Sequence, residues 1–72
     1  MLSKAEFTKR LAKRLKDLRK ARGISQELLA HEAQLYRTYV NHIETGRYSP
    51  SAFVVYKIAN ALGIKSADIL PF

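Results

Sequence analysis

Apolar residues recur at helical spacing through most of the chain, and the runs are separated by small polar residues and glycines. The first run places apolar residues three or four positions apart, as on one helix face: Phe7, Leu11, Leu15 and Leu18. Ser3 followed by Glu6 has the pattern of a capping box, and Gly23 is a natural C-terminal stop. The pattern predicts a first helix between Ser3 and Gly23.

Two short helical runs follow. Ser25 is an N-cap residue for a second helix, which extends from Gln26 to about Ala33. A third run covers Tyr36 to Thr45 and is closed by Gly46. Its apolar side consists of Tyr39, Val40 and Ile43. Its polar side consists of Arg37, Thr38, Asn41 and His42.

A fourth helix is predicted to end at Gly63, with either Ser49 or Ser51 as its cap beside Pro50. Its expected inward stripe is Ala52, Val55, Ala59 and Leu62, flanked by further apolar side chains at Phe53, Val54 and Tyr56. Ser66 is expected to cap a final turn through Leu70. No strand-like alternation competes with these helices, so the predicted fold class is all-α with five helices.

Length and composition narrow this picture. A chain of 72 residues allows one compact domain, expected over residues 1–72. Without cysteine, the chain has neither disulfides nor thiolate zinc sites to hold it together. No apolar stretch approaches the roughly 20 residues that span a bilayer. We therefore expect a cytoplasmic protein with an apolar core.

Charge suggests a polyanionic partner. Thirteen Lys and Arg against six Asp and Glu give a net charge of +7, which favours nucleic acid first and an anionic membrane second. Nine of the thirteen basic residues precede Gly23: Lys4, Lys9, Arg10, Lys13, Arg14, Lys16, Arg19, Lys20 and Arg22. This cluster is either a solvated helix face or a binding face for DNA, RNA or a membrane surface.

The sequence offers no catalytic pattern. It contains no nucleophile with a paired base, no carboxylate dyad, no phosphate-binding glycine loop and no metal-ligand cluster. His31 and His42 fall on different predicted helices, with no third ligand nearby in sequence. We expect a protein that is not an enzyme and needs no metal or cofactor.

The second and third helices have the residue types of a helix-turn-helix over about residues 25–45. A steep crossing of two short helices needs a small side chain at the closest approach, which Ala30 supplies. The chain here resembles the XRE-like family of phage repressor and Cro helix-turn-helix domains, most of all the controller proteins of restriction-modification systems. The segments that carry the likeness are SQELLAHEA at 25–33, LYRTYVNHIETG at 35–46 and KIANALGI at 57–64. The resemblance implies a compact lambda-repressor-like domain that binds double-stranded DNA and regulates transcription.

The resemblance also implies roles for particular residues. Base readers in the major groove would be Arg37, Thr38, Asn41 and His42, with the Arg37 guanidinium fitted to guanine O6 and N7. Contacts to the DNA backbone would come from Ser25, Gln26, Tyr36, Tyr39, Thr45 and Arg47. The alternatives are a plain N-terminal cap at residues 25 and 26, an exposed Arg37 that touches only phosphate, a solvent-exposed His42 and core packing of Tyr39. Arg19 and Glu44 match a structural ion pair of the family.

Two positions depart from the family pattern. Gln34 stands where the turn usually has glycine, so it either adopts a left-handed conformation at a cost of about 1 kcal/mol or reshapes the turn. Tyr36 replaces the usual Ser, Thr or Asp cap of the recognition helix.

Excess apolar area near the C-terminal end suggests a homodimer through residues 52–72. The expected interface residues are Phe53, Tyr56, Ile64, Ile69, Leu70 and Phe72; the alternative is that they enlarge a small core. A two-fold dimer would read half-sites roughly 34 to 36 Å apart in a near-palindromic operator. A different function for the same fold is an antitoxin-type module that binds a toxin protein and uses DNA secondarily. Besides DNA and a second copy of the chain, the possible partners are RNA polymerase and such a toxin protein.

Overall fold

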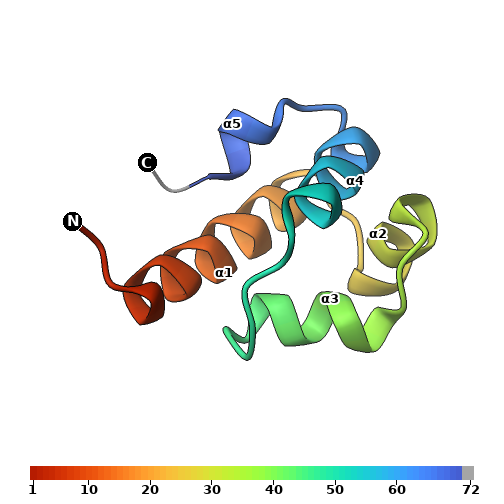
Figure 1. The fold of residues 1–72 in the computed structure, drawn as a ribbon. Coiled ribbons are helices and arrows are strands. Elements are labelled where there is room, and N and C mark those ends of the chain that lie inside the picture. The colour runs from red at the N-terminus through yellow and green to blue at the C-terminus, as the bar shows by residue number, and fades with distance from the viewer. Residues whose placement is uncertain (71–72) are drawn as a thin grey trace.

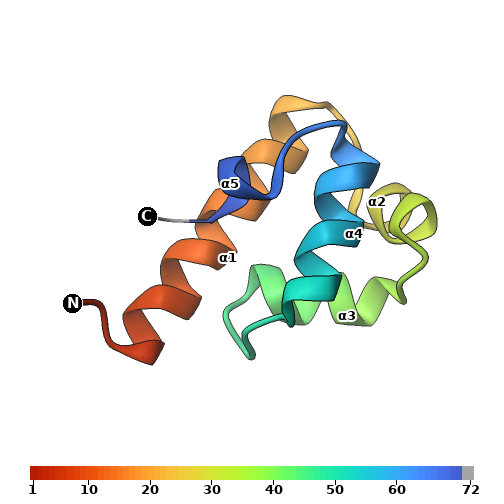
Figure 2. The same cartoon turned by 45° about the horizontal axis from the view of Figure 1, so that its top comes forward.

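The computed structural model describes residues 1–70 and contains five helices in that range, with no strand. The helices are α1 (Lys4–Ala21), α2 (Gln26–Ala33), α3 (Arg37–Glu44), α4 (Ala52–Leu62) and α5 (Ser66–Ile69). The prediction of an all-α, five-helix fold is confirmed. Figures 1 and 2 show α3 on one side of the molecule and α5 on the opposite side, with α1 and α4 between them.

Side-chain caps explain where three of the helices begin. The Ser3 hydroxyl accepts from the Glu6 amide at 3.1 Å, and the Glu6 carboxylate accepts from the Ser3 amide at 3.3 Å. These bonds from Ser3 hold the pKa of Glu6 below its usual value. Ser25 caps α2 in the same way, and Ser51 rather than Ser49 caps α4. Of the two caps considered for the fourth helix, the structure uses the later one.

The cap predicted for the last helix is wrong. Ser66 is the first residue of α5, and Lys65 occupies the cap position. The Asp68 carboxylate accepts from the Lys65 backbone N–H at 3.1 Å, and Lys65 makes no side-chain cap hydrogen bond to the first turn of α5.

The core lies where the faces of the longer helices meet. α2 packs on α3 and α4, α1 packs on α3 and α5, and α4 packs on α5. The largest fully buried side chains are Leu11, Leu15, Leu29, Val40, Ile43, Ile58, Leu62 and Ile69. On α4 the expected stripe is wrong at one end, because Ala52 is exposed while Val54 and Ile58 are buried. The buried side of α4 is therefore rotated slightly from the expected one.

Gln34 forms the turn that sets the angle between α2 and α3. Its backbone has φ 57° and ψ 47°, which is the left-handed conformation. It is the sole non-glycine residue with positive φ in the described chain. Gln34 therefore adopts the left-handed conformation and does not reshape the turn. The Leu35 amide then donates to the Ala30 carbonyl at 2.8 Å.

Among the described helices, none is both long and apolar enough to cross a membrane.

Candidate nucleic-acid interface

The outward side of α3 carries the polar residues expected there. Arg37 and Thr38 form its first turn, Asn41 lies one turn later, and all three are exposed. Together with Gln26 from the start of α2, they line one shallow depression on the surface. The turn at Gln34 therefore brings three predicted base readers beside a predicted backbone contact.

The N-terminal end of α3 is open to a ligand. Tyr36 is its cap residue, is 84% exposed and makes no side-chain cap hydrogen bond. The backbone N–H groups of the first helical turn consequently have no side-chain acceptor, and they carry the positive end of the helix dipole. This end of α3 suits an anionic group such as a phosphate.

A hydrogen-bond network ties this surface to a buried ion pair. Arg19 donates to the two carboxylate oxygens of Glu44, from Nε at 2.7 Å and from Nη2 at 3.0 Å, and both residues are buried. Its Nη1 donates to the Ile24 carbonyl at 2.8 Å. The structure thus brings Arg19 and Glu44 into the contact expected of them, with a bidentate geometry.

The network continues outward through two side-chain amides. Gln26 Nε2 donates to Glu44 Oε1 at 3.1 Å, and Asn41 Nδ2 donates to Gln26 Oε1 at 3.3 Å. Because Glu44 accepts only, it fixes which end of the Gln26 amide points inward, and Gln26 in turn orients the Asn41 amide. Asn41 Oδ1 and the second Nδ2–H remain available toward solvent. These are the acceptor and donor that an adenine edge requires.

Ser25 combines its capping role with a free hydroxyl hydrogen. Its Oγ accepts from the Leu28 amide at 3.0 Å, which leaves the O–H to donate elsewhere. The plain N-terminal cap considered for this position is therefore present, and it is compatible with a backbone contact.

The other edge of α3 is aromatic, and sequence reasoning missed its central residue. Tyr48, in the loop after α3, lies 5.2 Å from the Tyr39 ring and 5.5 Å from the His42 ring, measured between centroids. His42 Nδ1 is 3.2 Å from the Tyr48 hydroxyl oxygen. His42 is half-buried and lies outside the depression that holds Arg37, Thr38 and Asn41. An aromatic residue two positions after the helix-ending Gly46 was the available signal.

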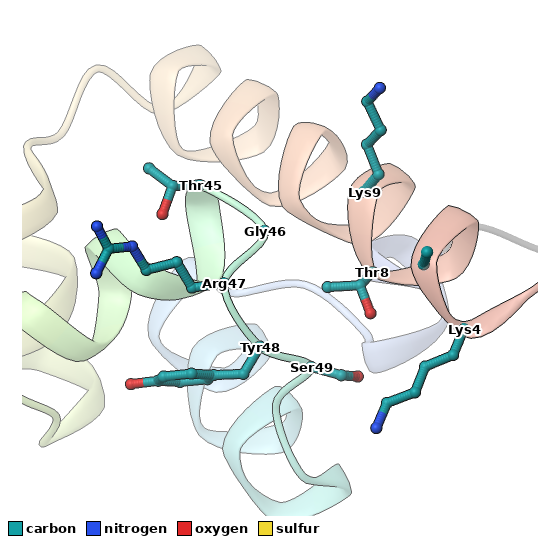
Figure 3. A pocket seen from close by; sticks show the side chains of 9 residues that line it. Lys4, Thr8, Lys9, Thr45, Gly46, Arg47, Tyr48 and Ser49 are labelled. Atoms are coloured by element: carbon teal, nitrogen blue, oxygen red, sulfur yellow. The ribbon is translucent and has the colours of Figure 1, made fainter.

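Thr45 and Arg47 mark the C-terminal end of α3. The Thr45 hydroxyl donates to the Asn41 carbonyl at 2.9 Å, so its hydrogen caps the helix and is not free for a phosphate. The expected contact of Thr45 with the DNA backbone stays a prediction. Arg47 is exposed and lines a hollow of about 720 Å³ between the loop and the start of α1. In Figure 3, Lys9 extends upward from α1, whereas Thr45 and Arg47 lie across the hollow and point away from α1.

The expected dimer residues divide into exposed and buried ones. Phe53 and Tyr56 are 66% and 57% exposed, and their rings stack with centroids 6.1 Å apart. Ile64 and Leu70 are half-buried. Ile69 is 1% exposed within the core, so its assignment to an interface is wrong. Phe72 lies outside the described residues.

Comparisons with known proteins agree with this architecture. A helix-turn-helix family model, HTH_3, matches residues 15–70. An immunity repressor protein of Bacillus phage phi105 is 40% identical over 60 residues, which are 83% of this chain and 42% of that protein. Control protein C.BamHI of Bacillus amyloliquefaciens is 44% identical over 50 residues, 69% of this chain and 62% of that protein.

A solved structure shows the same fold. The crystal structure of the restriction-modification controller protein C.AhdI from Aeromonas hydrophila superposes with a TM-score of 0.85 at 36% identity, covering 88% of this chain and 96% of that one. The chain spans 42% and 62% of the lengths of the phage repressor and C.BamHI. The resemblance to XRE-type controller and repressor domains is confirmed, and the chain belongs to the helix-turn-helix family HTH_3.

Proposed function

We propose that this protein is a sequence-specific, double-stranded DNA-binding regulator of transcription that reads bases with α3. The observation that carries the proposal is the depression in which Arg37, Thr38 and Asn41 converge with Gln26. Relatives named as an immunity repressor, a control protein and an HTH-type transcriptional regulator support it. An α-helix fits a major groove about 12 Å wide, where base pairs are distinguishable by their hydrogen-bonding edges.

Arg37 is the principal base reader in this proposal. It is exposed at the first position of α3 and makes no hydrogen bond or ion pair within the described chain. Its guanidinium can donate two hydrogen bonds to guanine, which contributes about 1 to 3 kcal/mol of discrimination. Asn41, oriented by Gln26, would read adenine, and Thr38 would contact either a base or a thymine methyl group.

Backbone contacts surround these base contacts. Gln26 retains one Nε2–H after bonding Glu44, and Ser25 retains its O–H, so both can donate to a phosphate at the start of α2. Tyr36 and Arg47 are exposed at the two ends of α3, and Tyr39 is half-buried against Tyr48. In this proposal His42 contacts the edge of the groove.

The protein would act as a homodimer. Phe53 and Tyr56 form a stacked apolar pair on α4, and an exposed pair of aromatic side chains is a typical element of an interface. A second copy placed on this face by a two-fold axis would bury both pairs. Such a dimer would recognise a near-palindromic operator with half-sites about one helical turn apart.

The test begins with selection of duplex DNA from a random pool. The selected sequence is then titrated with wild type, Arg37→Ala and the control Arg10→Ala, which removes an exposed arginine from α1. We expect a palindrome to be enriched. We expect Arg37→Ala to lose about 10- to 100-fold of its preference at one symmetric base pair, while Arg10→Ala keeps it.

Two results would contradict the proposal. The first is enrichment of no sequence despite salt-sensitive binding, which would leave a nonspecific or partner-dependent DNA-binding module. The second is equal discrimination by Arg37→Ala and wild type, which would remove α3 from base reading. Copurification with a small unrelated protein would instead favour an antitoxin-type module.

A further inference from the structure

Several basic residues of α1 lie on two opposite flanks of the helix. Lys9 lines the hollow beside Thr45 and Arg47, so its flank faces the end of α3. Arg14 donates from Nε to the Asp68 carbonyl at 2.8 Å, so the opposite flank faces α5. Lys13, Lys16 and Lys20 follow Lys9 by four, seven and eleven residues, which places them on the same flank as Lys9.

All four lysines of this row are exposed, and most of their positive charge has no ion-pair partner. The row consists of Lys9, Lys13, Lys16 and Lys20. Of the four, Lys13 alone has an ion pair within the described chain, with Asp17 at 2.9 Å. That hydrogen bond holds the pKa of Asp17 below its usual value, so the Asp17 carboxylate stays charged at neutral pH and compensates one lysine. The nearest carboxylate of α3, Glu44, is buried and already bonded to Arg19.

The Lys9 end of the row lies across the hollow from the C-terminal end of α3. Figure 3 shows Lys9 on α1 and Thr45 at the end of α3 on the two walls of this hollow. The hollow between them is lined by Lys4, Lys9 and Arg47 and by no carboxylate. From Lys9 to Lys20 the helix rises about 16 Å, enough to follow several phosphates of one DNA strand.

We propose that the lysine row of α1 is a second DNA-binding surface, which contacts the sugar-phosphate backbone beyond the bases read by α3. This inference rests on the proposed DNA-binding function and adds an element that lies outside the helix-turn-helix. The row supplies point charges on flexible side chains, which suit phosphates and carry no sequence information. It lengthens the footprint and increases affinity without changing specificity.

The test compares two double variants that each remove two positive charges. Lys9→Gln/Lys16→Gln removes lysines from the row. The control, Arg10→Gln/Lys65→Gln, removes exposed cations from the solvent side of α1 and from the cap position of α5. The dissociation constant of each protein is measured on the selected duplex and on a scrambled duplex, over a range of salt concentrations. Thermal melting checks that the folds are equally stable.

We expect the row variant to reduce the slope of log affinity against log salt by up to about 1.8, which is two phosphate contacts at about 0.9 each. The control should change the slope much less. The preference for selected over scrambled duplex should stay the same in both variants. Ethylation of phosphates that lie beyond the base pairs read by α3 should weaken DNA binding by wild type more than DNA binding by the row variant.

Equal slope changes in the two variants would show a general charge effect and overturn the proposed row. An unchanged slope in the row variant would overturn it as well. If wild type binds duplex DNA without sequence preference, the proposed function fails. The salt slopes of the two variants on that duplex then still show whether the lysine row contacts phosphates. If wild type binds RNA or anionic vesicles but no duplex DNA, both proposals fail.

Discussion

The outward faces of α3 and α4 are both exposed, but they are built from opposite chemistry. On α3 the side chains are polar, and Asn41 is held through Gln26 to the buried pair of Arg19 and Glu44. On α4 the exposed Phe53 and Tyr56 stack on each other, and Lys57 Nζ lies 5.5 Å from the centre of the Phe53 ring.

The two faces have different requirements in water. Polar groups on α3 are satisfied by water, so the face is stable when empty and its information lies in how the amides are oriented. Apolar area on α4 is unfavourable in water, so covering it releases free energy without requiring any particular hydrogen-bond geometry. In the proposed function, recognition belongs to α3 and association to α4, and substitutions on either face or in the connection between them test this division.

Breaking the anchor of the α3 face should have the largest effect. Arg19→Leu leaves the Glu44 carboxylate buried without its cation, which we expect to destabilise the fold by about 3 kcal/mol or more. For a domain of this size that lowers the Tm by about 12 °C or more. Thermal melting followed by circular dichroism measures it, with Arg10→Leu as a control on the exposed side of α1. Equal midpoints for the two variants would contradict a stabilising role for the pair.

Removing apolar area from the α4 face should have the next largest effect. Fully burying a Phe side chain contributes about 1.5 to 3 kcal/mol, and a two-fold interface contains Phe53 twice. Since Phe53 is 66% exposed in the single chain, we expect Phe53→Ser to weaken the dimer by at least about tenfold and to leave the fold stable. Sedimentation equilibrium measures this.

Leu28→Ser is the matched control, because Leu28 is an exposed apolar residue on α2 with 42% of its surface accessible. It should leave dimerisation unchanged. A wild-type protein that stays monomeric at high micromolar concentration would contradict the assignment of α4 to association.

The helices themselves were predictable because their signals are local. The capping box of Ser3 and Glu6 and the cap at Ser25 depend on residues three positions apart. The errors arose where two local solutions were nearly equivalent. At the start of α5, Asp68 accepts from the Lys65 N–H, and the helix begins at Ser66, one residue earlier than a Ser66 cap would place it. On α4, the choice between Ala52 and Ile58 as core residues depends on how α4 meets its neighbours.

The candidate site was predictable in part. Helical spacing placed Arg37, Thr38 and Asn41 on one face, and family resemblance supplied the pairing of Arg19 with Glu44. The contact between Gln26 and Asn41 depends on the angle between α2 and α3, which no pattern within either helix determines. The position of Tyr48 depends on the path of the loop after α3, for the same reason.

The smallest predicted effect concerns Gln34, which lies between the two faces. Its left-handed backbone sets the turn before α3, and its carbonyl accepts from Lys57 Nζ of α4 at 3.1 Å. Because glycine adopts this conformation without a Cβ clash, Gln34→Gly should stabilise the fold by about 1 kcal/mol and raise the Tm by about 4 to 8 °C. The carbonyl that bonds Lys57 is retained.

Gln34→Ala keeps the Cβ and removes the rest of the side chain, so it is the matched control and should show no such gain. Since the glycine variant preserves the turn, its DNA discrimination and its dimer strength should equal those of wild type. A gain in stability accompanied by lost discrimination would show instead that the left-handed turn at Gln34 holds α3 in an orientation that glycine does not maintain. The α3 face would then depend on backbone stiffness at residue 34 as well as on the amide network.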